Sequence, residues 1–166
     1  MIKRLRYITK KQAVLALTLF SALSPAYAFN LNVNVSATIM DPPCIINGNR
    51  PISVNFGNDI LISRINGYNY EQSIAYTLDC SAATSNLLKM QLKGSGATFN
   101  STLLATNKGN LGIELRSNGS KLAVNDWLNF TNPARPILTA VLVKNAAIAP
   151  TGGAFSASST FVVEYQ

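Results

Sequence analysis

FNLNVNVSATI, residues 29–39, is the stretch that decides the fold class, because apolar and polar side chains alternate strictly along it. Successive side chains of a β-strand point to opposite faces, so this segment would form a strand with one wholly apolar face. That face carries Leu31, Val33, Val35, Ala37 and Ile39. Asp41-Pro42-Pro43 follows, and proline lacks the N–H that a sheet ladder needs. We therefore expect a strand separated from the rest of the chain by a stiff spacer.

The end of the chain, residues 153–166, is a second alternating stretch. The side chains expected on its apolar face are Phe155, Ala157, Phe161, Val163 and Tyr165. An immunoglobulin-like sandwich normally continues into one more strand, which would cover this one, but the sequence stops at Gln166. The final strand is therefore predicted to be a sheet edge with an apolar face and a missing neighbour. Such an edge is an aggregation hazard unless another chain fills it.

A spare strand at one end and a missing strand at the other indicate strand donation between molecules. Main-chain hydrogen bonds would supply affinity and the alternate side chains would supply register. Burying five apolar side chains contributes roughly 7–15 kcal/mol before ordering costs, at about 1.5–3 kcal/mol each. Because the contact is head-to-tail, it generates an open filament.

The first 28 residues have the layout of a secretory signal peptide. A basic head precedes an apolar run over residues 13–24, and Ala26-Tyr27-Ala28 is a small-residue cleavage site. An uncleaved anchor is the alternative, but the apolar run is shorter than the roughly 20 residues that span a bilayer. The expected organisation is a signal peptide over 1–28, a donor-strand extension over 29–41 and one folded domain over 42–166.

Charge and composition exclude several function classes. The chain has 14 Lys and Arg against 7 Asp and Glu, but five of the basic residues lie in the signal peptide. The mature chain keeps 14 − 5 = 9 basic and 7 acidic residues, a net charge of +2, without a basic stripe for nucleic acid. With no histidine and no nucleophile motif, we expect no enzyme activity, no cofactor and no small-molecule substrate.

Cys44 and Cys80 are the two cysteines, and an even count in an exported chain favours a disulfide. Free thiols or half a metal site are the alternatives. A zinc site would have too few soft ligands, because the chain has no histidine and no CxxC.

Strand patterns dominate the rest of the sequence, with turn residues between them and no convincing helix. Residues 137–143, ILTAVLV, are apolar on both faces, as expected of a strand buried on both sides. Further strands are expected at 72–80, 87–92, 111–115 and 155–165. This pattern predicts an all-β sandwich. Trp127 is expected to be a core or partly buried packing residue rather than to stack a sugar.

Four features taken in order resemble the fimbrial subunits of the chaperone–usher family. The alternating segment leads into Asp41-Pro42-Pro43-Cys44, and Ile52-Ser-Val-Asn-Phe56-Gly57 follows. The second cysteine closes the run from Ile74 to Cys80, and the final strand has Gly153 fourteenth from the end and Tyr165 penultimate. More narrowly, Leu103-Leu104-Ala105-Thr106-Asn107 with Leu111-Gly112-Ile113 is similar to minor, tip-adaptor pilins of P-type pili.

The resemblance implies an incomplete immunoglobulin-like fold that lacks its last strand and is completed by a donated one. It implies a Cys44–Cys80 bridge, a periplasmic pilus chaperone that reads the strand from Gly153 to Tyr165, an outer-membrane usher and neighbouring pilus subunits. The location implied is a fimbrium on the bacterial cell surface, reached through the periplasm. The family commonly has glycine where this chain has Ala37. A rod subunit, a tip adaptor and a terminator stay open, as does a free-standing secreted, lectin-like binding module.

Overall fold

Short β-strands and two 3-10 turns make up residues 43–166, the part of the chain that the computed structural model describes. The predicted signal peptide and the donor-strand positions Leu31, Val33, Val35, Ala37 and Ile39 lie outside these residues. The elements, in chain order, are β1 (Ile45–Ile46), η1 (Asn47–Asn49), η2 (Ile62–Arg64), β2 (Gln72–Ser73), β3 (Leu78–Asp79), β4 (Leu87–Lys93), β5 (Gly96–Ala97), β6 (Asn100–Ala105), β7 (Leu111–Ser117), β8 (Ser120–Leu122), β9 (Leu128–Thr131), β10 (Leu138–Lys144) and β11 (Thr160–Tyr165).

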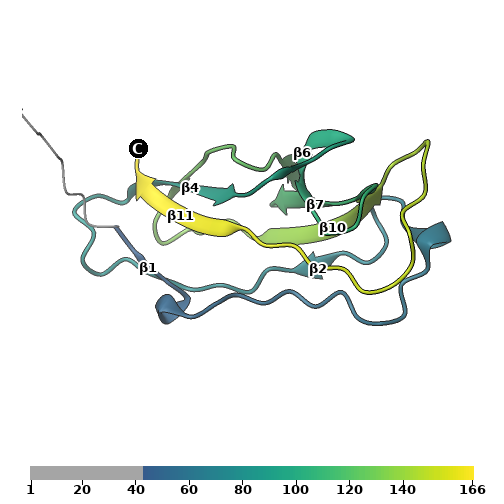
Figure 1. Cartoon of the computed structure of the whole chain (residues 1–166). Helices are drawn as coiled ribbons and strands as arrows, with labels where there is room; N and C mark the ends of the chain where they lie inside the picture. Colours follow the sequence, from purple (N-terminus) through teal and green to yellow (C-terminus); the bar gives the residue numbers. More distant parts are fainter. Residues whose placement is uncertain (1–42) are drawn as a thin grey trace, which may run out of the picture. The chain divides into compact units, whose positions relative to one another are not determined.

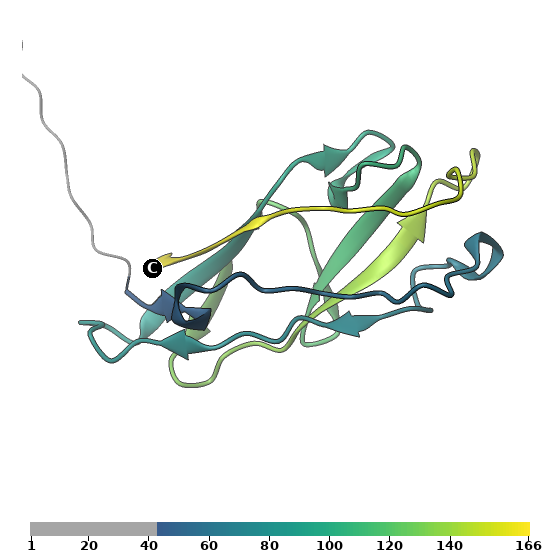
Figure 2. The same ribbon diagram turned by 60° about the horizontal axis from the view of Figure 1, so that its bottom comes forward.

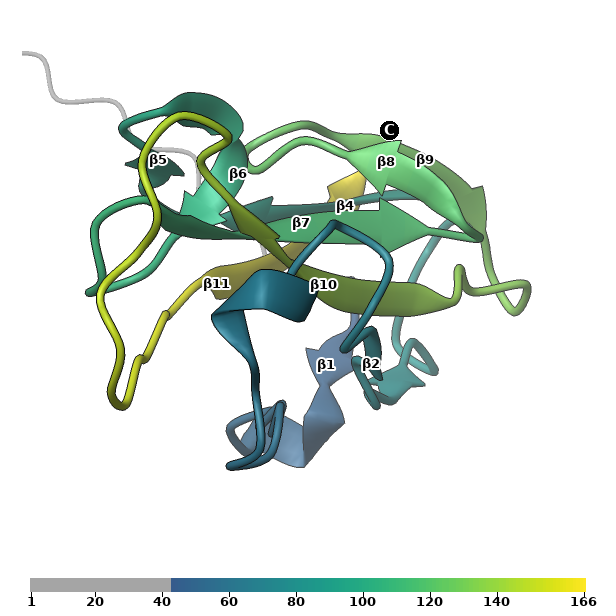
Figure 3. The ribbon, with the colours of Figure 1, turned by 90° about the vertical axis from the view of Figure 1, so that its right-hand side faces the viewer.

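Two antiparallel sheets face each other (Figures 1 and 3). The larger sheet has the order β2-β10-β7-β6-β5, with β8 paired to β7, and the smaller has the order β11-β4-β9. A third, two-stranded sheet joins β1 to β3. The all-β sandwich expected from the sequence is confirmed, and β11 is an edge strand within the described part of the chain.

The core lies between the two sheets and is built from their inward-facing side chains. Leu88 and Met90 of β4 and Leu138 and Leu142 of β10 are almost completely buried. Val141, next to Leu142, is buried as well, so β10 is covered on both faces, as its continuous apolar run predicts. A fully buried side chain of this size contributes about 1.5–3 kcal/mol, so these strands hold the sandwich together.

Two predicted strands are shorter than expected. Residues 72–80 form two pieces, because β2 pairs with β10 whereas β3 pairs with β1, and the chain changes sheet between them. Tyr76 lies in that crossing, buried, with its hydroxyl donating to the Pro136 carbonyl at 2.5 Å. The final strand begins at Thr160, so residues 154–159 are extended without a strand partner. The first difference is a change of sheet, and the second is the lack of a strand partner among the described residues; alternation alone reveals neither.

Other predictions of the sequence are met closely. The strands at 87–92, 111–115 and 137–143 correspond to β4, β7 and β10. The turn between β7 and β8 has Asn118 at φ 49° and Gly119 at φ 80°, the two positive φ values that a tight hairpin turn requires. Trp127 is 39% exposed, with the Lys89 ammonium 4.7 Å from the ring centre, so it packs at the surface and not in the core.

The disulfide between Cys44 and Cys80 is present and closes a loop with a sequence separation of 36. It joins the residues that flank the β1–β3 pair, where Ile45 is opposite Asp79. In the chain-entropy model, such a loop stabilises the fold by about 3–4 kcal/mol. Among residues 43–166, no helix has the length and apolarity to span a membrane.

An ion cluster around the buried Glu114 carboxylate fastens the outer face of the large sheet. The Glu114 side chain is 7% exposed, and its two oxygens lie 2.7 Å from the Arg116 guanidinium and 2.7 Å from the Lys121 ammonium. Arg116 also donates to the Gly67 carbonyl at 2.6 Å. The cluster therefore ties the loop before β2 to the sheet, which is a structural task.

Candidate functional site: an open groove between two unpaired segments

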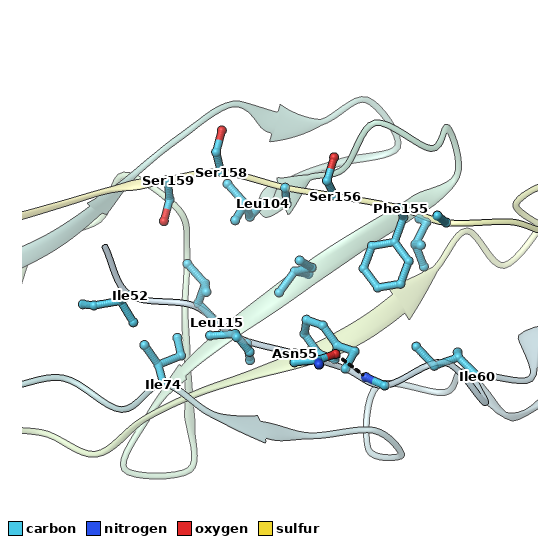
Figure 4. Close-up of a pocket in the computed structure, with 18 of the residues that line it drawn as sticks. Ile52, Asn55, Ile60, Ile74, Leu104, Leu115, Phe155, Ser156, Ser158 and Ser159 are labelled. Carbon is cyan, nitrogen blue, oxygen red and sulfur yellow. Dashed lines mark hydrogen bonds between the residues drawn. The ribbon is translucent and has the colours of Figure 1, made fainter. Parts of the chain in front are cut away.

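The dominant feature of the described residues is a groove of about 1170 Å³ along one side of the sandwich. Two extended segments form its walls, residues 52–60 and residues 154–159, and neither belongs to a strand. Figure 4 shows them running past each other, with Ile52 opposite Ser159 and Ile60 at the other end, beyond Phe155. A sandwich with two unpaired segments side by side has space for one more strand between them.

The first wall continues the alternating pattern of a strand although it has no strand partner. Ile52, Val54 and Phe56 are half-buried and line the groove, while the intervening Ser53 and Asn55 are exposed. The wall ends in a turn at Gly57, which has φ 85° and donates its N–H to the Asn55 side-chain oxygen at 2.8 Å. Residues 52–56 therefore already have strand-like alternation before any neighbour arrives.

The second wall begins at Gly153, whose φ of 103° lies in a region that L side chains rarely adopt. From there the chain alternates: Phe155 and Ser159 point into the groove in Figure 4, while Ser156 and Ser158 point away from it. The predicted apolar face is therefore oriented as expected at Phe155, but Ser159 adds a polar group on that face. Glycine at position 153 is thus explained by backbone conformation.

Asn107 holds the second wall from outside the groove. Its backbone N–H donates to the Ser156 carbonyl at 2.9 Å, and its side-chain oxygen accepts from the Ser156 N–H at 2.8 Å. In an extended chain the N–H and C=O of alternate residues point to opposite sides. The backbone N–H and C=O of Ser156 point toward Asn107. The backbone groups of Phe155 and Ala157 therefore point the other way, toward the groove.

The same alternation continues along β11. Gln166 donates its N–H to the Leu87 carbonyl of β4, so the even-numbered residues pair with β4. The odd-numbered residues direct their backbone groups to the other side of the strand. The groove edge is thus a row of donors and acceptors that continues from Phe155 through Phe161.

The floor of the groove is the apolar core itself. Leu92, Leu104, Ile113, Leu115 and Ala140 line it, and all five are buried in the sandwich. The rings of Phe56 and Phe155 approach across the groove with their centres 5.8 Å apart. An inserted strand would therefore cover apolar side chains from both sheets and would meet this aromatic pair between the walls.

The last two residues are fastened to the body of the sandwich. The Tyr165 hydroxyl accepts from the Thr84 N–H at 3.0 Å. The Gln166 side-chain amide donates to the carbonyls of Leu88 and Phe130 at 2.8 and 3.2 Å. Val163 is buried in the core, and Phe161 packs edge-on against Tyr76 with ring centres 5.1 Å apart.

The structure brings together the predicted residues of the C-terminal strand in one wall and one strand edge. Phe155, Ala157 and Phe161 line the groove with Gly153, whereas Val163 and Tyr165 lie beyond it along β11. Sequence reasoning did not assign the first wall or the floor to this site. The alternation of Ile52, Val54 and Phe56 was a usable signal for the wall, but no local pattern marks Asn107.

The groove offers no catalytic chemistry of a familiar kind. Its lining is aliphatic and aromatic, with asparagine, serine and threonine side chains and one arginine, Arg50. Within residues 43–166 there is no group of three or more His, Cys, Asp or Glu side chains that could hold a metal ion. What the groove presents is backbone hydrogen-bonding capacity along apolar walls, which suits an extended polypeptide.

Comparison with known proteins agrees with this geometry. The family model described as "Fimbrial protein" matches residues 33–166. The chain is 42% identical over 130 residues to "Uncharacterized fimbrial-like protein YfcR" of Escherichia coli (strain K12), covering 75% of this chain and 74% of the relative.

Two solved structures share the fold. The P pilus adaptor subunit PapF matches with a TM-score of 0.57 at 22% identity, over 75% of this chain and 97% of PapF. The P pilus rod subunit PapA matches with a TM-score of 0.55 at 25% identity, over 81% of this chain and 100% of PapA. The likeness to both establishes an immunoglobulin-like pilin fold for this chain.

Proposed function

The chain belongs to the fimbrial protein family, and from that premise we propose that it polymerises by taking a β-strand from one neighbouring subunit and giving its own extension to another. As a member of this family it is a structural pilus subunit and not an enzyme. Its partners include other pilus subunits. The proposal concerns the means of assembly: residues 31–39 are the donated strand, and the groove between residues 52–60 and 154–159 is the acceptor.

The observation that carries the proposal is that both walls of the groove are extended and that neither is paired to a strand among the described residues. Residues 52–60 make no backbone–backbone hydrogen bond to another described residue. Nine residues of strand are roughly 30 Å long, at about 3.3 Å each. The predicted donor strand, residues 31–39, has the same number of residues as this wall, so one extension suits one groove.

The side chains of the two parts are complementary. The donor face is Leu31, Val33, Val35, Ala37 and Ile39, and the floor of the groove is aliphatic. Burying five such side chains contributes roughly 7–15 kcal/mol before ordering costs. The Phe56–Phe155 pair lies where the strand would pass, so it adds aromatic surface for the strand to cover.

An empty groove with apolar walls is an aggregation hazard, so the subunit needs a cover before assembly. We propose that a periplasmic chaperone pairs with the row from Phe155 to Tyr165 and that exchange takes place at an outer-membrane usher. The mature subunit then lies in a fimbrium on the cell surface. The anchoring of Tyr165 and Gln166 supports this part, because it holds β11 in place as a strand edge.

The narrower expectation was a minor, tip-adaptor subunit that acts in adhesion, and it depended on residues 103–113. Those residues have packing tasks: Leu103, Leu104 and Ile113 are buried. Gly112 lies close beneath Leu103, where an added Cβ would be 3.1 Å from the Leu103 Cβ. Core packing of this kind serves an adaptor and a rod subunit alike, so we propose a pilus subunit without a fixed place along the pilus.

A free-standing, lectin-like binding module is the competing hypothesis. Such a module would be stable as a monomer, with the groove closed by its own strand. Residues 31–39, which would have to close it, lie outside the described residues. The family membership favours the polymerising subunit.

Expression with and without a candidate pilus chaperone tests the proposal. We expect the mature chain alone to be degraded or to aggregate, and the chaperone complex to release the subunit when a synthetic peptide of residues 29–41 or of a sibling subunit's extension is added. A matched peptide with Val35→Asp should fail, because it would bury an unpaired charge. A stable, soluble monomer that ignores every peptide would count for the free-standing module instead.

A further inference from the structure

The seven large hydrophobic side chains that are exposed among the described residues include two pairs, one at each end of the sandwich. Leu61 and Ile148 are 53% and 59% exposed at the end where the loops 57–64 and 145–152 lie (Figure 2). Ile45 and Leu87 are 46% and 54% exposed at the opposite end, beside the C-terminus. We call the first end, with its two loops, the distal pole, and the second, with the Cys44–Cys80 bridge, the disulfide pole.

The distal pole lies at one end of the groove, and its two exposed apolar side chains are close in sequence to residues that line the groove. Leu61 directly follows Ile60 of the first wall, and Ile148 is two residues before Pro150, which also lines the groove. The Lys144 ammonium at the end of β10 donates to the Ile62 carbonyl at 2.9 Å. This bond ties the loop after the first wall to the end of β10, and the loop 145–152 that leads to the second wall starts from the same strand end.

The disulfide pole lies where the extension enters the folded body. Ile45 directly follows Cys44, and Leu87 accepts the backbone N–H of Gln166 at 3.2 Å. Only Met40 to Pro43 separate the predicted donor strand from Cys44. Four residues span at most roughly 13–14 Å even when fully extended. A body whose extension fills a groove therefore has its disulfide pole close to the end of that groove.

Strand direction decides which end of the groove that is. In a complete immunoglobulin-like sandwich, the final strand pairs antiparallel with the strand that precedes it, and here β11 corresponds to that preceding strand. β11 runs from the distal pole toward the disulfide pole (Figure 2), so an antiparallel donor runs toward the distal pole and Ile39 would emerge there. The spacer then brings the next body against Leu61 and Ile148.

We propose that the distal pole is the docking surface for the disulfide pole of a second copy of this chain, the copy whose residues 31–39 fill the groove. The inference rests on the proposed function and adds a second contact to it. Leu61 and Ile148 of one copy cover Ile45 and Leu87 of the next, and all four lose exposure to water. The contact fixes the angle between the folded domains of successive copies. Strand insertion alone would leave that angle undefined, because a spacer joins the strand to its domain.

Two complexes of the same subunit test this. In one, the groove is filled by the synthetic peptide of residues 29–41, which has no body; in the other, it is filled by a whole second copy. We expect backbone amides of the two distal loops to exchange hydrogen more slowly only in the second complex. A short bismaleimide should join Ile148→Cys of the acceptor to Ile45→Cys of the donor. Tyr68→Cys of the acceptor is the matched control, because Tyr68 is 76% exposed and lies over Arg116 of β7, 5.5 Å from it.

The outcomes separate the two proposals. If no peptide enters the groove, the proposed function itself fails. If the peptide enters but a second copy never does, or if both complexes form and the distal loops exchange equally in each, the docking surface is refuted while strand exchange stands. Cross-linking at Tyr68→Cys as readily as at Ile148→Cys would also refute it.

Discussion

Replacing Asn107 by alanine should loosen the second wall of the groove without unfolding the sandwich. The side chain is exposed, and its oxygen accepts the Ser156 N–H at 2.8 Å. An intramolecular hydrogen bond of this kind contributes about 0.5–1.5 kcal/mol net. The backbone contact between Asn107 N–H and the Ser156 carbonyl does not depend on the side chain. The substitution is therefore expected to cost about 1 kcal/mol of the free energy that holds residues 154–159 in their extended conformation.

That loss should appear as weaker capture of a donor strand, because the strand must then order the wall as it enters. A change of 1 kcal/mol corresponds to about a five-fold change in an equilibrium constant. The assay is competition at equilibrium: wild type and Asn107→Ala, each released from its chaperone complex, compete for a limiting labelled peptide of residues 29–41. Asn107→Asp is the matched control, since its carboxylate still accepts the Ser156 N–H.

We expect wild type and Asn107→Asp to take up similar amounts of peptide and Asn107→Ala to take up about five-fold less, in line with the lost hydrogen bond. Equal uptake by all three proteins would refute the reasoning that Asn107 prearranges the backbone groups of Phe155 and Ala157.

Three further changes test other parts of the account. Burial tends to raise the pKa of Glu114, but hydrogen bonds from Lys121 and Arg116 outweigh it, so the pKa is lowered. The lowered pKa means that the ionised Glu114 stabilises the folded state. That stabilisation is present above the unfolded-state pKa and is lost as pH falls through the folded-state pKa. Glu114→Gln should therefore flatten the acid side of a plot of urea midpoint against pH, and an unchanged slope would contradict the assignment. Cys80→Ser should lower the free energy of unfolding by about 3–4 kcal/mol, with a loss below about 1 kcal/mol counting against the loop-closure argument. Val35→Asp in the whole subunit should abolish incorporation into pili while leaving recovery of the chaperone complex unchanged, and normal incorporation would remove the donor role from this segment.

Alternation carried most of the fold prediction, and it worked where a strand has both neighbours. β4, β7 and β10 were predicted because each is buried against partners on both sides, so their side chains keep a simple pattern. The pattern over 155–165 was read as a complete strand, yet the structure pairs only Thr160–Tyr165. Side-chain alternation reports which face is apolar and says nothing of whether a hydrogen-bonded neighbour exists.

The groove was predictable in outline and not in its parts. An apolar final strand with a missing neighbour indicated a sheet edge, and β11 is an edge strand among residues 43–166. The floor could not be found from the sequence, because Leu92, Leu104 and Ile113 come from three different strands that only the topology brings together. The Asn107–Ser156 contact joins residues 49 positions apart, and asparagine in a turn has many local uses that look the same in sequence.

The most direct measurement of strand exchange is the structure of the subunit in complex with an isotope-labelled peptide of residues 29–41. The account predicts that the peptide lies between residues 52–60 and 154–159, antiparallel to β11, with backbone hydrogen bonds to Phe155 and Ala157. Finding the subunit's own residues 31–39 in that groove, in a monomer that is stable without helper proteins and excludes the peptide, would contradict it.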